Sequence, residues 1–204
     1  MAYSSYKNLK KIIDKFGITV EPNSLFSSDT IKPIEPSNWL KTSMEMSEML
    51  GFCSEKERSE RLTNPILTEL VKINNDQITL YSGRKLNMNK DLEGTCDYLI
   101  TLGHKVIDYF TAPLFSIVQA PKQDISHGIA QCVVQLMGVK MYNENDGIQL
   151  PYLYGATTDG QKWRFLKFKD NVVTIHEDYY TLDNLPLLLG VLSHLVNDCK
   201  SFKM

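Results

Sequence analysis

A few polar side chains stand among apolar ones in the middle of the chain, where they could carry out chemistry. Asp97 interrupts an apolar run, Gln119 and Lys122 follow it along the chain, and Gln131 lies in the helical pattern after them. Carboxylate and amide oxygens bind hard cations, and lysine stabilises negative charge. Because an acid is unfavourable in a strand, propensity alone places Asp97 at an edge or near a turn. The sequence has no glycine-rich phosphate loop, Ser-His-Asp arrangement or zinc-ligand spacing, which argues against nucleotide hydrolases and esterases.

The order of these residues is similar to that of the PD-(D/E)xK nuclease superfamily. In that family an acid on one strand precedes an acid-x-Lys on the next strand, and a glutamine-bearing helix follows. The motif residues lie in Gly94–Ile100 and Phe115–Gln131, and the resemblance extends over about residues 54–168. It implies a restriction-endonuclease-like fold and hydrolysis of phosphodiester bonds, for which carboxylates hold a divalent metal and a lysine stabilises charge or activates water.

The resemblance also implies a role for each motif residue, and two positions depart from the family pattern. Asp97 is the metal-binding acid for Mg²⁺ or Mn²⁺. Gln119 occupies the place of the second acid and is a weakened metal ligand, while Pro121 occupies the place of the lysine. Lys122 is the candidate catalytic lysine. On a regular strand it points away from the face that positions 119 and 121 share, and a bulge at Pro121 would bring it onto that face.

Two supporting residues come from helices. Glu60, on the helix upstream, is a candidate additional carboxylate, as a helix-borne glutamate is in parts of the family. Gln131 is the match to the family's helix glutamine, and it belongs to a polar stripe with Asp124, Gly128 and Gln135. Amphipathicity alone leaves two interpretations open, a stripe beside the site and a stripe facing solvent.

A later strand alternates cations with aromatic residues. Lys162, Arg164 and Lys167 are candidates for nucleic-acid binding because cations bind phosphates and aromatic rings stack on bases. Ordinary alternation in a half-buried strand explains the same pattern. Both interpretations stay open at this stage.

The periodicity of apolar residues predicts the elements that must position these side chains. Three helices are predicted early in the chain from their capping residues, which include a capping box of Ser54 and Glu57. The third helix is expected to be kinked or restarted near Pro65. A connector rich in proline and serine separates the first two. The expected helices cover about residues 5–16, 38–50, 54–70, 124–142 and 184–199, and the expected strands cover 78–81, 85–88, 95–102, 114–120, 152–158, 162–168 and 172–176.

This order of elements predicts an α/β (α+β) fold with a mixed sheet flanked by helices. With 204 residues the chain is expected to form one domain, a nuclease-like part over 54–204 with an N-terminal helical extension, 1–53, packed on it. No membrane span or secretory signal is apparent, so a cytoplasmic location is expected. The four cysteines are far apart and are expected to be buried thiols.

Three hypotheses about function follow. The leading one is a Mg²⁺-dependent phosphodiesterase that acts on DNA. The second is a non-catalytic module for binding or assembly that keeps the fold, motivated by the residues at 119 and 121. The third, a protein-interaction domain unrelated to nucleic acid, is favoured by a net charge of -2 and a pI near 6.1. Nuclease folds often work as dimers, so a homodimer is a further expectation.

Overall fold

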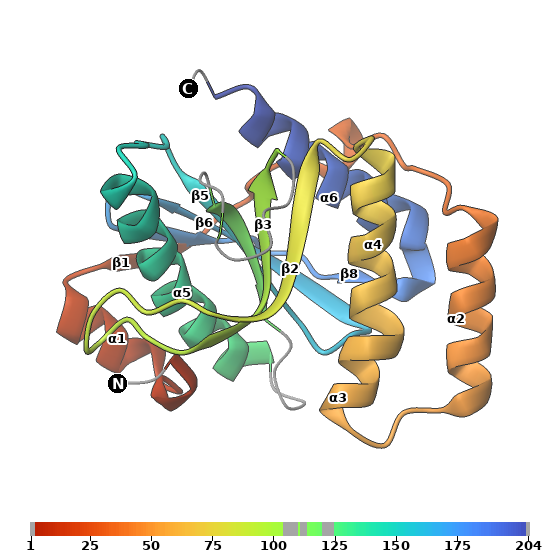
Figure 1. Cartoon of the computed structure of the whole chain (residues 1–204), viewed down its shortest axis with the longest axis horizontal. Coiled ribbons are helices and arrows are strands. Elements are labelled where there is room, and N and C mark those ends of the chain that lie inside the picture. The colour runs from red at the N-terminus through yellow and green to blue at the C-terminus, as the bar shows by residue number, and fades with distance from the viewer. Residues whose placement is uncertain (1–2, 104–109, 111–113, 120–124, 203–204) are drawn as a thin grey trace.

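A computed structural model shows that the chain has a mixed α/β fold in which helices cover both faces of one sheet (Figure 1). It describes residues 3–103, 110, 114–119 and 125–202, with 114–119 described by their backbone. Eight described strands form the sheet in the order β1-β7-β6-β5-β4-β3-β2, and β8 pairs with β6. The strands are β1 Thr19–Pro22, β2 Ile78–Lys85, β3 Thr95–Leu102, β4 Leu114–Gln119, β5 Leu153–Thr158, β6 Lys162–Lys169, β7 Val172–Ile175 and β8 Tyr180–Thr181.

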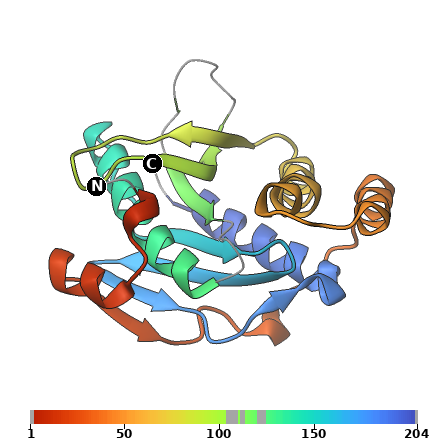
Figure 2. The ribbon, with the colours of Figure 1, turned by 90° about the horizontal axis from the view of Figure 1, so that it is seen from below.

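The helices form a layer on each side of the sheet, as the view from below shows (Figure 2). One layer contains α1 and α5 and buries a core with Leu99, Val133 and Leu166. The other contains α4 and α6, with α2 outside α4, and buries a core with Leu67, Trp163 and Leu192. The helices are η1 Tyr3–Ser5, α1 Leu9–Phe16, η2 Ser28–Thr30, α2 Asn38–Leu50, α3 Glu55–Arg58, η3 Ser59–Thr63, α4 Asn64–Ile73, α5 Ile125–Asn145, η4 Leu182–Asn184 and α6 Leu185–Lys200.

The expected helices and most of the expected strands are present, with one correction in the middle third. Residues 85–88 do not form a separate strand, because β2 continues through Gly83 as far as Lys85. Gly83 has a φ of 62°, in the left-handed region that glycine adopts without a side-chain clash. The strand therefore bends at this glycine instead of ending at it. Residue 120, the last of the expected strand 114–120, lies outside the described residues.

The N-terminal segment is part of the sheet as well as packed on it. β1 pairs in parallel with β7, from Thr19 opposite Val172 to Pro22 opposite Ile175, and forms one edge of the sheet. Pro22, which has no N–H to donate, ends this edge strand, where a proline is tolerated. The expected helical extension thus also supplies a strand.

The connector that follows β1 crosses α6 at close range. The backbone N–H of Ile34 donates to the carbonyl oxygen of Pro186 at 2.9 Å. A Cβ added at Gly190, in the middle of α6, would lie 2.5 Å from the carbonyl oxygen of Lys32. The glycine therefore provides the space in which the connector lies.

The cysteines depart from expectation at one position. Cys96, Cys132 and Cys199 are buried free thiols, as expected. Burial raises the pKa of the Cys132 thiol to about 12. Cys53 is exposed, because it lies in the short turn between α2 and α3, where no helix or strand covers it.

His176 is buried in the core between the sheet and α6. Its ring stacks on Phe26 with 4.4 Å between centroids, and its Nδ1 accepts a hydrogen bond from the backbone N–H of Leu25 at 3.0 Å. An acceptor at Nδ1 places the proton on Nε2, which faces the hydroxyl of Tyr180 at 3.2 Å. Burial lowers the pKa of His176, because the charged imidazolium is poorly solvated there.

The lowered pKa predicts a loss of stability in acid. Between the folded pKa and the unfolded value of about 6.5, the unfolded chain binds more protons, so stability rises with pH. The contribution of His176 is therefore complete above about pH 6.5 and is lost as the pH falls toward the folded pKa, by at most about 1.4 kcal/mol per pH unit. Urea unfolding between pH 5 and 8 measures this slope. It should flatten in His176→Gln but not in His127→Gln, a change at an exposed residue of α5, and an unchanged slope in His176→Gln would contradict the assignment.

Candidate functional site

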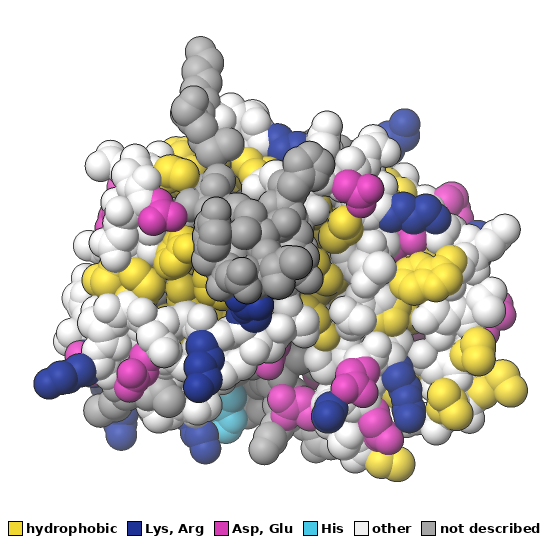
Figure 3. Space-filling model, viewed as in Figure 1, with side chains coloured by type: hydrophobic (Ala, Val, Ile, Leu, Met, Phe, Trp, Pro, Cys, Tyr) yellow, Lys and Arg dark blue, Asp and Glu magenta, His cyan; other side chains and the backbone are white. Residues whose placement is uncertain are grey.

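A cavity of about 670 Å³ lies between the ends of β2 and β3 and the helix that starts at α3. Asp97 and Glu60, both expected site residues, line it together. In the space-filling view, acidic and basic side chains gather over α3 at the lower edge of the molecule (Figure 3). The residues that line the cavity are Cys53, Ser54, Glu55, Lys56, Arg58, Ser59, Glu60, Ser82, Asp97 and Tyr98.

An interruption in the pleat of β3 brings Asp97 into this cavity. Consecutive residues of a regular strand point to opposite faces, yet Asp97 and Tyr98 both line the cavity. Cys96 and Leu99, three residues apart, pack in the same core, which also requires one break in the alternation between them. The break lies opposite the bend at Gly83 on β2, since the pairs on either side of that glycine are Ser82 with Tyr98 and Arg84 with Cys96.

The register between β3 and β4 places position 119 beside Asp97. The two strands are antiparallel, and Tyr98 pairs with Val118 and Leu99 with Ile117. One step further along the same register sets the backbone of Gln119 opposite Asp97. Gln119 also pairs with Thr157 of β5 on its other side. Pro121 and Lys122 lie outside the described residues, as does the bulge considered at Pro121.

Glu60 is presented by a widened turn in a long helix. α3, η3 and α4 are continuous from Glu55 to Ile73, and η3 is a π-helical turn in which the N–H of Asn64 bonds back to the carbonyl oxygen of Ser59. Pro65 follows this turn and has no N–H for the carbonyl oxygen of Arg61, which accepts instead from Ser47 Oγ of α2 at 2.9 Å. The helix expected to be kinked or restarted near Pro65 runs through the proline without a break, and its irregularity is a π turn immediately before it. Such turns are frequent at functional sites.

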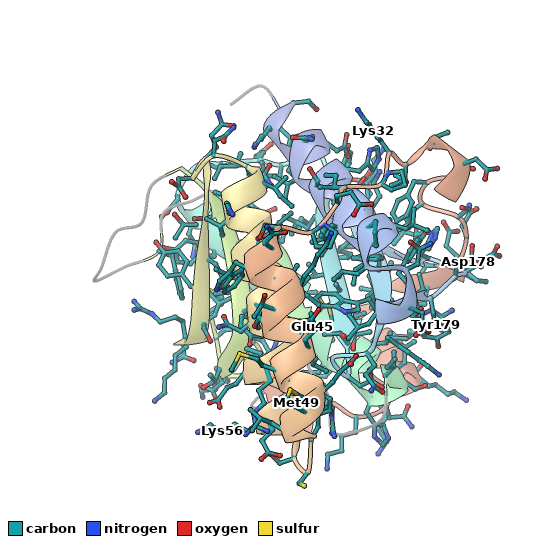
Figure 4. All side chains as sticks on the ribbon, turned by 90° about the vertical axis from the view of Figure 1, so that its right-hand side faces the viewer. Lys32, Glu45, Met49, Lys56, Asp178 and Tyr179 are labelled. Atoms are coloured by element: carbon teal, nitrogen blue, oxygen red, sulfur yellow. The ribbon has the colours of Figure 1, made fainter. Side chains whose placement is uncertain are left out.

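Tyr98 joins β3 to this widened turn. Its hydroxyl donates to the carbonyl oxygen of Ser59 at 3.0 Å and lies 2.8 Å from Ser59 Oγ. Burial raises the pKa of Tyr98, and the negative charges of Asp97 and Glu60 add to the effect. The two acids are therefore close enough to act on the same phenol, and the carboxylate of Glu60 itself pairs with Lys56 at 3.7 Å. Figure 4 shows Lys56 at the lower end of this helix, below α2.

The carboxylates of the cavity meet part of the requirement for a divalent metal. Across the described ranges, no group of three or more His, Cys, Asp and Glu side chains could hold a metal ion. Mg²⁺, however, is often bound by one or two carboxylates together with waters and substrate phosphates. One carboxylate oxygen of Glu55 on the cavity wall, Oε2, is buried and has no hydrogen-bond partner in the described part of the chain. A cation at this oxygen would supply the partner that it lacks.

The helix glutamine is not placed in this cavity. α5 packs on the opposite face of the sheet from α4, and Gln131, which is half-buried, does not line the cavity. The polar stripe does not face solvent either, because Gly128 and Gln135 are buried. Asp124, the first residue of the stripe, lies outside the described residues.

The three cations of β6 are not brought together. Arg164 donates to the carbonyl oxygen of His176 at 3.0 Å and to the hydroxyl of Tyr179 at 3.0 Å. The ammonium of Lys167 lies over the ring of Tyr152, 3.6 Å from its centroid. Residues three apart on a regular strand point to opposite faces, and Lys162 lines a different cavity near η4. The structure therefore gives Arg164 and Lys167 local packing roles on opposite faces.

Sequence reasoning missed Glu55, Arg58 and Tyr98 as residues of the cavity. Glu55 and Arg58 lie in the charged first half of the helix, and nothing in the order of charges there singles out one from another. Tyr98 reads as part of an apolar run. One signal could have indicated the break in β3. Gly83 lies opposite Asp97, and a glycine inside a strand pattern marks a bend or bulge.

Comparisons with protein-family models and with curated proteins found no match to the chain. Among the residues that the structure describes, no helix is both long enough and apolar enough to span a membrane.

Proposed function

We propose that the cavity between α3 and the ends of β2 and β3 is the active site of a metal-dependent phosphodiesterase acting on DNA. The observation that carries the proposal is the convergence of Asp97 and Glu60 on one cavity, with position 119 opposite Asp97 in the sheet. The resemblance to PD-(D/E)xK nucleases motivates the choice of chemistry. In that family pattern one strand carries an acid, and the neighbouring strand carries a second metal ligand beside it.

Each residue then has a defined part in the reaction. Asp97 would hold Mg²⁺ or Mn²⁺, with Gln119 as a weaker second ligand through its amide oxygen and Glu60 as an additional carboxylate. A metal held by these residues would supply positive charge to offset the charge that develops on the phosphate when water adds and the P–O bond to the leaving oxygen breaks. Lys122 is proposed to stabilise the same charge. A glutamine in place of a carboxylate lowers the affinity for Mg²⁺, so turnover is expected to be slow.

The second candidate function is a binding or assembly module without turnover. It is favoured by Gln119 and Pro121, which replace the acid and the lysine of the family pattern. In this case DNA binding or self-association would persist without cleavage. A homodimer and a cytoplasmic location also stay predictions.

Calorimetric titration of Mg²⁺ and Mn²⁺ into the parent protein and into Asp97→Asn tests the proposal, followed by cleavage of labelled single- and double-stranded DNA. Asp97→Asn should weaken metal binding at least about tenfold and abolish cleavage, because it removes the charge of the ligand at nearly constant size. Asp146→Asn, at an exposed acid that does not line the cavity, is the matched control and should leave both unchanged.

The outcomes separate the two functions. If neither metal binds at millimolar concentration and no DNA is cut, the phosphodiesterase is excluded and the binding module takes its place. Metal binding and cleavage that survive in Asp97→Asn would exclude this cavity as the active site.

A further inference from the structure

The positive charges around the candidate site have different environments. The helix from Glu55 through η3 carries three cations. Lys56 has a side chain that is 83% exposed and pairs with Glu60. Arg61 donates to the carbonyl oxygen of Gly51 at 2.8 Å and pairs with Glu57 at 3.7 Å. Both cations are therefore already engaged with groups of the protein.

Arg58 differs from these two. It is half-buried and lines the cavity together with Asp97. Its guanidinium forms no hydrogen bond or ion pair with any residue in the described ranges 3–103, 110, 114–119 and 125–202. A partly buried guanidinium that forms no ion pair is unfavourable, because five donors lose some of their water without a replacement. An anion supplied from outside the chain would remove that cost.

The base of the Arg58 side chain is held in place. The turn between β5 and β6 approaches the helix at Gly160, where an added Cβ would lie 3.3 Å from the Cβ of Arg58 and 3.1 Å from a methyl carbon of Leu62. Gly160 has a φ of 94°, so the turn also needs glycine for its backbone. The turn therefore packs against the Cβ of Arg58 and fixes where its side chain leaves the helix.

We propose that Arg58 is the phosphate-binding residue of the cavity and that its ligand is a phosphodiester group of a DNA strand. The identity of the strand as substrate rests on the proposed function, whereas anion binding by Arg58 does not. The planar guanidinium can hold two phosphate oxygens at once, a geometry that an ammonium cannot reproduce. Arg58 would hold the phosphate on one side while the carboxylates of Asp97 and Glu60 lie on others.

The test is the binding of a fluorescein-labelled single-stranded DNA oligonucleotide, followed by fluorescence anisotropy in EDTA, so that no metal takes part. Arg58→Ala should weaken binding by about tenfold to a hundredfold, as expected for the loss of a hydrogen-bonded charge pair. It should also lower the dependence of log K on log salt by about 0.7 to 1, the contribution of one phosphate contact. Arg58→Lys keeps the charge and should lose less affinity than Arg58→Ala.

Lys56→Gln is the matched control, because it removes one positive charge from the same cavity wall. It should weaken binding by no more than about threefold, as expected for an exposed cation. Equal losses in Arg58→Ala and Lys56→Gln, or a parent protein that does not bind the oligonucleotide, would overturn the role of Arg58. Thermal unfolding of each variant checks its fold, and Arg58→Lys carries the test if Arg58→Ala does not fold.

Two further arms identify the ligand and separate this proposal from the catalytic one. In the first, inorganic phosphate competes with the labelled oligonucleotide. If it displaces the oligonucleotide as effectively as unlabelled DNA at the same phosphate concentration, the site binds free phosphate and the DNA assignment is overturned. If Arg58→Ala alone loses affinity while no metal binds, the phosphate site stands and the phosphodiesterase fails. If metal binding and cleavage depend on Asp97 but not on Arg58, the phosphodiesterase stands and the phosphate site at Arg58 fails.

Discussion

Replacing Gln119 with Glu and Pro121 with Lys is expected to raise Mg²⁺-dependent DNA cleavage by at least about a hundredfold over the parent protein. The register of β3 and β4 sets the backbone of position 119 opposite that of Asp97, so the new carboxylate would be carried by the strand next to the existing one. On a regular strand the side chain at 121 points to the same face as that at 119. The double substitution therefore restores the acid and the lysine of the family pattern on one face.

Single and triple variants show which part of the gain each group supplies. Gln119→Glu alone should tighten Mg²⁺ binding in calorimetry with a smaller gain in cleavage, because it adds a hard anionic ligand but no lysine. Adding Asp97→Asn to the restored protein should abolish the gain. If Gln119→Glu leaves the affinity for Mg²⁺ unchanged, position 119 does not contribute to a metal site.

Gly190→Ala should destabilise the protein by about 2 kcal/mol, although alanine normally stabilises a helix interior relative to glycine by about 1 kcal/mol. The added methyl group would lie 2.5 Å from the carbonyl oxygen of Lys32 and 3.0 Å from a side-chain methyl of Ile31. A backbone oxygen cannot turn aside as a flexible side chain can. The connector must therefore move away from α6, which weakens the bond from Ile34 to Pro186.

Thermal unfolding measures the effect, which should appear as a fall in Tm of about 4–8 °C for a chain of this size. Asn197→Ala is the matched control, since it introduces alanine at an exposed position of the same helix. It should leave Tm equal or slightly higher. A Gly190→Ala variant as stable as the parent would mean that the connector does not lie against α6.

Local sequence signals predicted most of the fold because they act over a few residues. The capping box of Ser54 and Glu57 is present with both of its hydrogen bonds, and the helix expected at 184–199 is α6. The edge strands β1 and β8 were not predicted. They have four and two residues, and their pairing depends on partners that lie elsewhere in the chain. No local pattern contains that information.

The sequence singled out two acidic residues of the candidate site but not the residues around them. Asp97 and Glu60 share a cavity, as the resemblance suggests, although each lies at a departure from regular periodicity. Arg58 and Tyr98 could not be predicted, because no local pattern distinguishes them from their neighbours. The bend opposite Gly83 resets the pleat of β3, and the π turn of η3 changes which side chains the helix presents to the sheet.

The parallel pairing of β1 with β7 determines the order in which the molecule can assemble on the ribosome. Synthesis delivers Thr19–Pro22 early, but its partner Val172–Ile175 emerges only after β2 through β6 have been made. β1 is thus expected to stay unpaired until β7 has formed. Contacts of such long sequence separation slow folding and prolong the exposure of an unpaired edge. Closure of this edge by β1 is expected to be a late step of folding.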